Sequence, residues 1–578
     1  MGYYSNFPKY MSIFESFQLT KQRRDFFMLI LDAINVKKNF GEREIISFDQ
    51  LQIRSGDKIG VVGRNGAGKT TLLNILSGEL LPDEGIVKSF CDVAYIKQFS
   101  DEEIEADAKA LSEFGVQYII KRSKVSGGEQ TRLKIAGALS KNSLLLFADE
   151  PTANLDFKGI QTLKNKLSKA ESLVLISHDR ELLDSVCNKI IEVSDGRITL
   201  FQGNFSFYQK QKQKMVDREW FEYESYIDEK KHLEGAIKNR KARAKTIKKA
   251  PARMGNSEAR LHTRASNEMQ EKIHDAANNL KTRLEKLEVK SKPKELPSIK
   301  LDFSLTNPPH NKTVVSSDDF SFCYGEREIF VNAKFQIYNG MKQAIIGDNG
   351  AGKTTLLNQI YNSFQSKQLN DFDSTENNIN IVPKAVLGYF CQGFENLDLQ
   401  KTVLENVMQV SVQNETTVRT ILARLLITGD DVYKTVGVLS GGERIKVSFA
   451  KLFVSSANVL LLDEPTNYLD MASIEALQNI LNEYEGTVVF VSHDKTFING
   501  VAQRLLVVKD SQILTFEGSL EAYEYKYNTT KKQENIETQK MILQMRITEV
   551  LSKLSQTNAN NEKLEAEYQE LIMQMKLL

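Results

Sequence analysis

Three short motifs occur twice, in the same order, in this chain of 578 residues. The pairs are GRNGAGKTTLLN at 63–74 and GDNGAGKTTLLN at 347–358, SGGE at 126–129 and 440–443, and DEPTANLD at 149–156 and DEPTNYLD at 463–470. A repeat of this length predicts two homologous domains in tandem. The second copy contains about thirty extra residues, near 362–384 and 393–436.

The first motif has the pattern G-x-x-x-x-G-K-T, and each copy follows a short apolar run and precedes a helical run. This is the context of a phosphate-binding loop, in which backbone N–H groups approach the phosphate oxygens. We expect the lysine to pair with the β and γ phosphates and the threonine after it to ligate magnesium. The expected nucleotide-binding residues are Gly63, Arg64, Asn65, Gly66, Ala67, Gly68, Lys69, Thr70 and Thr71 in the first copy, and Gly347, Asp348, Asn349, Gly350, Ala351, Gly352, Lys353, Thr354 and Thr355 in the second.

Two apolar runs, LLLFADE and VLLLDE, end in pairs of acids, Asp149 with Glu150 and Asp463 with Glu464. Such runs predict buried parallel strands, and ligands of parallel sheets bind at the carboxyl ends of the strands. We expect each aspartate to hold magnesium and each glutamate to orient the attacking water. The sequence therefore predicts an α/β fold and an ATP-hydrolysing enzyme with ATP and Mg²⁺ as its cofactors.

The SGGE motif, followed by QTR or RIK and then by DEPTxxLD and SHD, resembles the ATP-binding cassette superfamily over 28–204 and 313–528. The resemblance implies that the two cassettes face each other head to tail, so that the SGGE signature of one contacts the ATP held by the other. The signature residues are Ser126, Gly127, Gly128 and Glu129, and Ser440, Gly441, Gly442 and Glu443. The first signature departs slightly from the family pattern, because Val125 stands where leucine is usual.

The same resemblance implies further roles at each nucleotide. Phe40 and Tyr324 would stack on adenine, and His178 and His493 would contact the γ phosphate. Two glutamines would sense magnesium and water, and these are Gln98 and Gln392. The expected magnesium set is thus Thr70, Gln98, Asp149, Thr354, Gln392 and Asp463.

Two segments outside the cassettes have helical spacing. In the linker, 205–312, apolar residues recur at helical intervals, and Pro251 and Gly255 interrupt the pattern, which predicts an antiparallel hairpin. The linker positions are Met269, Ile273, Ala276, Leu280, Leu284 and Leu287. The C-terminal extension, 529–578, repeats the pattern on both sides of TNANN, at Leu543, Ile547, Val550 and Leu554, and at Leu564, Tyr568, Leu571 and Met575. It predicts a second, smaller hairpin.

Basic residues gather where the linker is expected to turn. Between 238 and 264 there are ten lysines or arginines and one acid, Glu258. They are Lys238, Arg240, Lys241, Arg243, Lys245, Lys248, Lys249, Arg253, Arg260 and Arg264. A charge run is usually a solvated helical face, but the near absence of acids at a hairpin tip favours contact with nucleic-acid phosphates.

No stretch approaches the ~18 to 20 apolar residues needed to cross a bilayer. We expect a soluble, cytoplasmic protein without a membrane partner, and a monomer in which the two cassettes pair. The four cysteines, Cys91, Cys187, Cys323 and Cys391, are far apart, which fits a reducing compartment. Residues 1–27 carry no readable signal, and we expect them to be an appendage upstream of a start at Met28.

Tandem cassettes joined by a charged helical hairpin resemble the ABC-F proteins. Only 27 residues lie between Gln98 and Ser126, which leaves no room for the arm insertion of the housekeeping members. With the C-terminal extension, this resembles the antibiotic-resistance branch. The resemblance implies binding at the E site of the 70S ribosome and contact of the linker with 23S rRNA and P-site tRNA. It also implies displacement of lincosamide, pleuromutilin or streptogramin A drugs from the peptidyl-transferase centre.

Three alternatives stay open at this point. One is an ABC-F translation factor without a drug role, and the second is a DNA-repair-type tandem ATPase that prefers branched DNA to ribosomes. The third is the ATPase subunit of a drug exporter, for which the sequence provides no coupling partner. The residues at the tip, 250–256, would set the drug range, but their spacing does not decode it.

Overall fold

The computed structural model describes ten stretches of the chain, and these are 28–97, 107–116, 127–141, 143–153, 155–246, 256–292, 303–368, 378–390, 396–556 and 562–577. Several predictions lie outside these stretches. They concern the appendage 1–27, the linker turn, and the side-chain placement of Gln98, Ser126, Lys248, Lys249, Arg253 and Gln392. Arg260 lies in a helix, but its side chain is not described.

The chain divides into two compact units. One consists of Met1–Leu200 together with Ser298–Leu578 and contains both cassettes and the C-terminal extension. The other is Phe201–Pro297, the central hairpin. The linker was expected to continue to residue 312. The structure differs there, because the short 3₁₀ helix η2 (Phe303–Thr306) packs Phe303 against Tyr484 of the second cassette at 5.4 Å between ring centroids.

The first cassette contains, in its described part, a six-stranded sheet in the order β5-β6-β7-β3-β8-β9 and a three-stranded sheet in the order β2-β1-β4. Its strands are β1 (Leu29–Phe40), β2 (Arg43–Arg54), β3 (Lys58–Gly63), β4 (Glu84–Ser89), β5 (Val93–Ile96), β6 (Leu145–Asp149), β7 (Ser172–Ile176), β8 (Lys189–Ser194) and β9 (Arg197–Gln202). Its helices are α2 (Lys69–Leu76), α3 (Ala108–Glu113), α4 (Gly127–Ser140), α5 (Phe157–Leu167) and α6 (Arg180–Val186).

The second cassette repeats this topology, with the sheets β14-β15-β16-β12-β17-β18 and β11-β10-β13. Its strands are β10 (Thr313–Tyr324), β11 (Arg327–Tyr338), β12 (Lys342–Ile346), β13 (Asn380–Ile381), β14 (Leu387–Phe390), β15 (Val459–Asp463), β16 (Thr487–Val491), β17 (Arg504–Lys509) and β18 (Gln512–Glu517). Its helices are α9 (Lys353–Gln368), α10 (Val403–Met408), α11 (Glu415–Arg424), α12 (Gly441–Phe453), α13 (Met471–Glu483) and α14 (Lys495–Val501), with the 3₁₀ turns η4 (Gly429–Tyr433) and η5 (Val436–Val438).

The central strands of both cassettes are buried along their whole length, as the continuous apolar runs predict. β6, β7, β15 and β16 have no exposed residue, and each pairs in parallel with its neighbours. This burial is typical of a parallel sheet covered by helices on both faces. The fold class predicted from the sequence, two α/β cassettes with helical segments, is confirmed.

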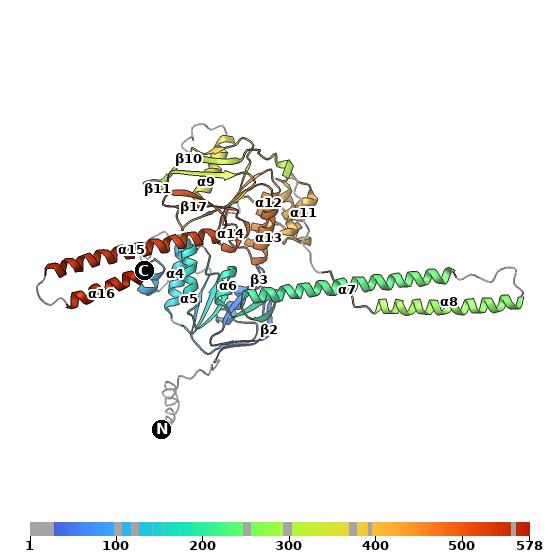
Figure 1. The fold of residues 1–578 in the computed structure, drawn as a ribbon. Helices are drawn as coiled ribbons and strands as arrows, with labels where there is room; N and C mark the ends of the chain where they lie inside the picture. The colour runs from blue at the N-terminus through green and yellow to red at the C-terminus, as the bar shows by residue number, and fades with distance from the viewer. Residues whose placement is uncertain are drawn as a thin grey trace, which may run out of the picture. The chain divides into compact units, whose positions relative to one another are not determined.

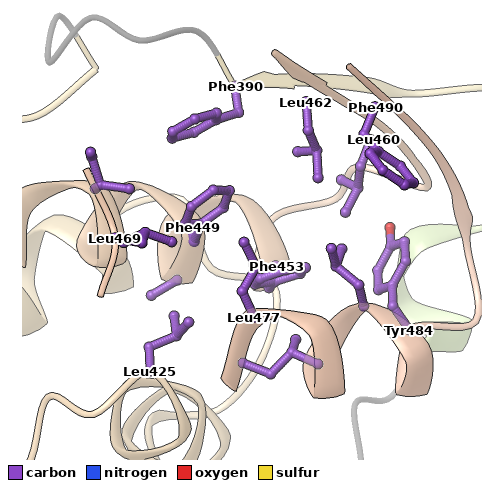
Figure 2. Packing of buried hydrophobic residues seen from close by; sticks show 14 of the residues in the cluster. Phe390, Leu425, Phe449, Phe453, Leu460, Leu462, Leu469, Leu477, Tyr484 and Phe490 are labelled. Carbon is purple, nitrogen blue, oxygen red and sulfur yellow. The ribbon is translucent and has the colours of Figure 1, made fainter. Parts of the chain in front are cut away.

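The helical side of the second cassette has the largest described core, part of which Figure 2 shows. Phe390 at the end of β14 stacks on Phe449 of α12 at 4.2 Å between ring centroids. Tyr484 is buried, and its hydroxyl donates to the carbonyl of Ala457 at 2.9 Å. The contact between Phe390 and Phe449 ties α12, which begins with the second signature, to the sheet that carries Asp463.

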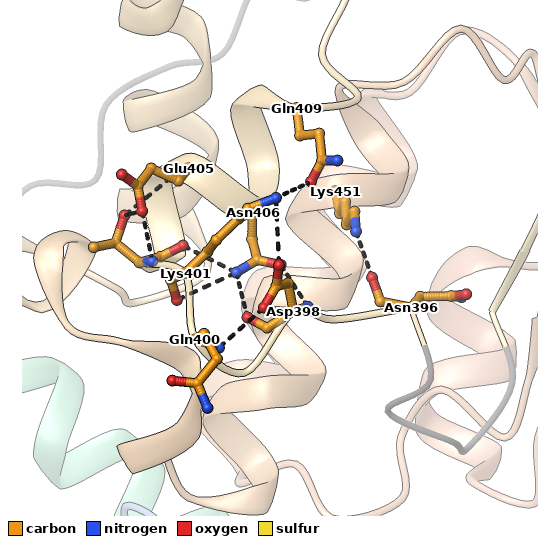
Figure 3. Close-up of polar contacts among 9 residues, drawn as sticks. Asn396, Asp398, Gln400, Lys401, Glu405, Asn406, Gln409 and Lys451 are labelled. Atoms are coloured by element: carbon orange, nitrogen blue, oxygen red, sulfur yellow. Dashed lines mark hydrogen bonds and ion pairs between the residues drawn. The ribbon is translucent and has the colours of Figure 1, made fainter.

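The extra residues of the second copy form part of this helical side. α9 is 16 residues long, whereas α2 is 8, and α10 and α11 lie within the predicted insertion. Asn406 organises the turn before α10, as Figure 3 shows. Its buried amide donates to the carbonyls of Asp398 at 2.9 Å and Thr402 at 3.1 Å, and its oxygen accepts the N–H of Asp398 at 2.9 Å.

Both predicted hairpins are present (Figure 1). The central one pairs α7 (Phe205–Thr246) with α8 (Asn256–Glu285), and the C-terminal one pairs α15 (Leu520–Gln556) with α16 (Glu562–Leu577). Leu233, Ala244 and Ala277 are buried in the central hairpin, and Val550 and Leu571 are buried in the C-terminal one. Met269, one of the apolar residues at helical spacing in the linker, is exposed. Among the described helices, none combines the length and the hydrophobicity that a membrane span requires.

Candidate active site

Each phosphate-binding loop connects a central strand to the helix after it, β3 to α2 and β12 to α9. The Nζ atom of Lys69 donates to the carbonyls of Gly63 at 2.8 Å and Arg64 at 3.1 Å. Lys353 repeats this with Gly347 at 2.9 Å and Asp348 at 3.1 Å. The lysines therefore lie across their own loops, where an incoming phosphate would be held.

The glycine before each lysine is required by its backbone. Gly68 has a φ of +100° and Gly352 a φ of +103°, a region that L side chains rarely adopt. A Cβ on Gly352 would lie 2.4 Å from the Ile329 side chain, so no larger residue fits. Ala67 and Ala351, by contrast, pack against the cassette cores.

The aspartates at the ends of β6 and β15 lie beside the loop threonines. The hydroxyl of Thr354 donates to Asp463 Oδ1 at 3.1 Å, and Thr70 forms the equivalent hydrogen bond with Asp149. Burial raises the pKa of Asp149 to about 6 and also raises the pKa of Asp463. A buried carboxylate beside a hydroxyl is a fitting donor pair for a hard cation such as magnesium.

The adjacent glutamates have an unusual backbone conformation. Glu150 has a φ of 45° and Glu464 a φ of 47°, in the left-handed region that non-glycine residues seldom occupy. Burial raises the pKa of each carboxyl to about 7, and Lys69 and Lys353 oppose this effect in their own cassettes. The other carboxylate oxygen of Glu150, Oε2, accepts the backbone N–H of His178 at 3.3 Å.

Each histidine lies next to the glutamate of its own cassette. Nε2 of His178 is 3.3 Å from Glu150 Oε1, and Nε2 of His493 is 3.4 Å from Glu464 Oε1. Burial, followed by the nearby loop lysine, lowers the pKa of His178 to about 3 and that of His493 to about 4, so both imidazoles are neutral. The aspartate after each histidine caps the following helix and so fixes the end of the strand: Asp179 accepts from the N–H of Leu182 and Asp494 from that of Phe497, each at 3.0 Å.

A cavity of about 800 Å³ lies at the first phosphate-binding loop, and residues of both cassettes line it. Its lining includes the expected Phe40, Asn65, Gly66, Gly68, Lys69, Thr70, Thr71, Asp149, Glu150, His178, Ser440, Gly441 and Gly442. A Cβ on Gly442 would lie 2.8 Å from the side-chain nitrogen of Asn65, so the second signature closely approaches the first loop. Glu443 does not line this cavity. It completes a capping box at the start of α12, where its carboxylate accepts the N–H of Ser440 at 2.8 Å.

A second cavity, of about 410 Å³, lies at the second loop. Of the expected residues it contains Tyr324, Asn349, Gly350, Gly352, Lys353, Thr354, Thr355, Glu464 and His493. The described lining of this cavity also includes two residues of the first cassette, Thr152 and Leu155. Gly128 and Glu129 lie at the start of α4 and do not line it. In the described part of the chain, the second signature lies at a nucleotide loop, and Ser126 of the first signature lies outside that part.

Two aspartates that the sequence analysis gave no role join the cassettes. Asp470 Oδ2 accepts the N–H of Asn65 at 2.8 Å, and its Oδ1 caps α13 through the N–H of Ser473 at 2.8 Å. Asp156 does the same for the other loop: it accepts the N–H of Asn349 and caps α5 through Gly159 at 2.9 Å. Hydrogen bonds and basic neighbours keep the pKa of both aspartates low despite burial.

Each of these aspartates also lies near a basic residue of its own signature helix. Arg132 forms an ion pair with Asp156 at 2.8 Å, and Lys446 occupies the matching position beside Asp470. The signal for this pairing is in the sequence, since both pairs are 24 residues apart within the repeat. Each aspartate therefore connects its own signature helix to the opposite phosphate-binding loop.

Two family models, both described as ABC transporter, match this chain. One covers residues 48–153 and 330–467, and the other covers 191–274. A solved structure titled RNase-L Inhibitor shares the fold with a TM-score of 0.55, at 20% sequence identity, over 84% of this chain and 90% of that one.

Curated relatives match over most of the chain. Ribosome protection protein VmlR of Bacillus subtilis is 30% identical over 95% of this chain and 98% of its own length. Erythromycin resistance ATP-binding protein MsrA of Staphylococcus epidermidis is 32% identical over 79% and 93%. ABC transporter F family member 5 of Arabidopsis thaliana is 30% identical over 86% and 76%. With two ATP-binding cassettes and this degree of similarity, the chain belongs to the ABC-F family of tandem-cassette ATPases.

Proposed function

We propose that this ATPase is a ribosome-protection protein that acts in the cytoplasm. In this proposal it binds the E site of the 70S ribosome, and its central hairpin reaches 23S rRNA and P-site tRNA. The hairpin then displaces lincosamide, pleuromutilin or streptogramin A drugs from the peptidyl-transferase centre. The names of two relatives, a ribosome protection protein and an erythromycin resistance protein, support this proposed function.

The observation that carries the proposal is the basic end of the central hairpin. Lys238, Lys241 and Lys245 on α7 and Arg264 on α8 are exposed, as are Arg240 and Arg243. Arg240 also donates to the carbonyl of Ala276 at 2.9 Å, so it holds the two helices together. A surface of exposed cations with almost no acids would bind phosphates with an affinity that falls steeply with salt.

We propose the following division of roles in ATP hydrolysis. Lys69 and Lys353 hold the phosphates, and Thr70 with Asp149, and Thr354 with Asp463, hold Mg²⁺. Bound magnesium would neutralise charge on the phosphate oxygens. Glu150 and Glu464 orient the attacking water, and the neutral His178 and His493 lie 3.3 and 3.4 Å from these carboxylates.

The test is co-sedimentation with 70S ribosomes, using the double variant Glu150→Gln with Glu464→Gln. The loss of both carboxylates should slow hydrolysis and retain ATP, so we expect binding with ATP, weak binding with ADP, and an affinity that decreases with salt. Indifference to ribosomes in every nucleotide state would discard the proposal and make branched DNA the next ligand to test.

A matched pair of hairpin variants isolates the basic surface. Lys241→Glu with Lys245→Glu changes two exposed cations within the basic segment, and Lys230→Glu with Lys231→Glu makes the same charge change elsewhere on α7. If the segment contacts RNA phosphates, the first pair should weaken binding and reduce the log–log salt slope by about one to two. Equal effects of the two pairs would point to net charge alone.

An ABC-F translation factor without a drug role is the second candidate, because relatives such as the Arabidopsis protein carry names without a resistance role. Expression in a drug-sensitive host separates the two functions. Ribosome protection raises the inhibitory concentration of the drug and requires intact Glu150 and Glu464. A translation factor leaves that concentration unchanged.

A further inference from the structure

Phe157, the first residue of α5 in the first cassette, contacts the second cassette. Its half-buried ring packs against the core on the helical side of that cassette. There it meets the imidazole of His493 edge to face, with 5.5 Å between the ring centroids and 72° between the planes. His493 lines both cavities, so the ring of Phe157 lies beside a side chain of the catalytic region.

The contact continues to the C-terminal helix. Lys495, two residues after His493, holds its Nζ atom 5.7 Å from the centre of the Phe157 ring and 2.7 Å from Oε1 of Glu524 on α15. The same two helices are joined at Asn499, whose side-chain oxygen accepts the N–H of Leu520 at 3.1 Å. An unbroken series of contacts therefore connects Phe157, His493, α14 and the first turns of α15.

The first site is built differently. The repeat makes Met471 of the second cassette equivalent to Phe157 of the first, so the first site has methionine in place of the aromatic ring. In the same way, Arg180 is equivalent to Lys495, and Gln209 is equivalent to Glu524. Arg180 approaches the carbonyl of Met471 at 3.5 Å and the carboxylate of Glu475 at 3.4 Å. In the part of the chain that the structure describes, the aromatic contact with the histidine beside the glutamate thus belongs to the second site.

We propose that Phe157 is a positioning residue for the second site. Its ring, supplied by the opposite cassette, holds the His493 imidazole in place, and Lys495 with Glu524 extends this restraint to α15. Aromatic pairs have a preferred geometry that aliphatic side chains do not reproduce. The inference rests on the roles proposed above for Glu464 and His493.

The test measures steady-state hydrolysis with one site silenced at a time. Glu150→Gln leaves the second site to report, and Glu464→Gln leaves the first. In the Glu150→Gln background we expect Phe157→Ala to lower kcat about 2- to 10-fold with little change in KM for ATP. The loss should be clearly smaller in the Glu464→Gln background.

Two further variants separate the ring from simple bulk. Phe157→Tyr keeps the aromatic ring and should restore kcat, whereas Phe157→Leu fills similar space without a ring and should not. Met471→Ala is the matched control in the other cassette, and it should not reproduce the selective loss at the second site. For the link to α15, Glu524→Gln combined with Phe157→Ala should cost less than the sum of the single changes.

Each contrary result has a distinct meaning. Full activity of Phe157→Leu, or equal losses in both backgrounds, would overturn the positioning role while leaving the assignment of Glu464 intact. Additive effects of Glu524→Gln and Phe157→Ala would remove α15 from the inference. If Glu464→Gln alone did not reduce hydrolysis, the catalytic assignment would fail together with everything inferred from it.

Discussion

The backbone N–H of Asn65 donates to Asp470 Oδ2 at 2.8 Å, although the two residues are 405 positions apart. The bond joins the phosphate-binding loop of one cassette to the residue that caps α13 in the other. Since Lys446 of the signature helix faces the same carboxylate, the loop, the cap and the signature share one side chain. The second cassette therefore contacts the first phosphate-binding loop through Asp470.

Asp470→Asn should break the cassette contact and spare the helix cap. The substitution keeps Oδ1, which accepts the Ser473 N–H, and replaces Oδ2, which accepts the Asn65 N–H, with an amide that cannot accept it. A hydrogen bond to a charged group is worth about 1.5 to 3 kcal/mol, so the contact between the two cassettes should weaken about 10- to 150-fold. Hydrolysis rates at limiting ATP measure the loss. A folded Asp470→Asn protein with the wild-type rate would contradict this role.

Much of this site could be predicted from the sequence, because its motifs are local. A loop between an apolar strand and a helix, or an acid pair at the end of a buried strand, has its physical context within a few residues. The bond between Asn65 and Asp470 has no such context, since it depends on how two cassettes meet. Phe157 likewise reads as an ordinary helix residue until His493 is placed beside it.

The helix-capping role of Glu443 could have been predicted from the sequence, but a different role was predicted for it. Ser440 and Glu443 have the S-x-x-E spacing of a capping box, and the structure shows this arrangement at the start of α12. The family resemblance instead directed Glu443 to the nucleotide. The left-handed backbone of Glu150 and Glu464 was not readable, because no glycine or asparagine marks it.

The double variant Glu150→Gln with Glu464→Gln should be more stable than the wild type at pH 8, without nucleotide or magnesium. The folded pKa of each carboxyl, about 7, exceeds its ordinary value of 4.5, so the folded state binds more protons between these values. Wild-type stability therefore falls as the pH rises from 4.5 through 7, by on the order of 3 kcal/mol per group. The glutamines remove this loss.

Thermal unfolding across pH 4.5 to 8.5 checks this expectation. The difference in Tm between the variant and the wild type should be greatest above pH 7 and vanish toward pH 4.5. Glu328→Gln, which changes an exposed carboxylate on β11, is the control and should follow the wild type. A difference in Tm that does not vary with pH would show that packing, rather than ionisation, separates the proteins.

Asn406→Ala should destabilise the helical side of the second cassette by about 2 to 4 kcal/mol. The change removes the side-chain hydrogen bonds of Asn406 and leaves the N–H of Asp398 without its partner, while the carbonyls of Asp398 and Thr402 keep only their backbone donors. Denaturant unfolding and hydrogen exchange over 396–412 measure the effect. Gln409→Ala removes an exposed amide at the C-cap of the same helix and should change stability by less than about 0.5 kcal/mol.

The presence of both cassettes on one polypeptide has a consequence for enzyme kinetics. A cassette that needed a separate partner would close at a rate set by how often two molecules meet. Here the partner is tethered, and its effective concentration is a property of the chain. The ATPase rate per molecule should therefore stay constant on dilution from micromolar to nanomolar protein, and the enzyme would need no minimum abundance in the cell to be active.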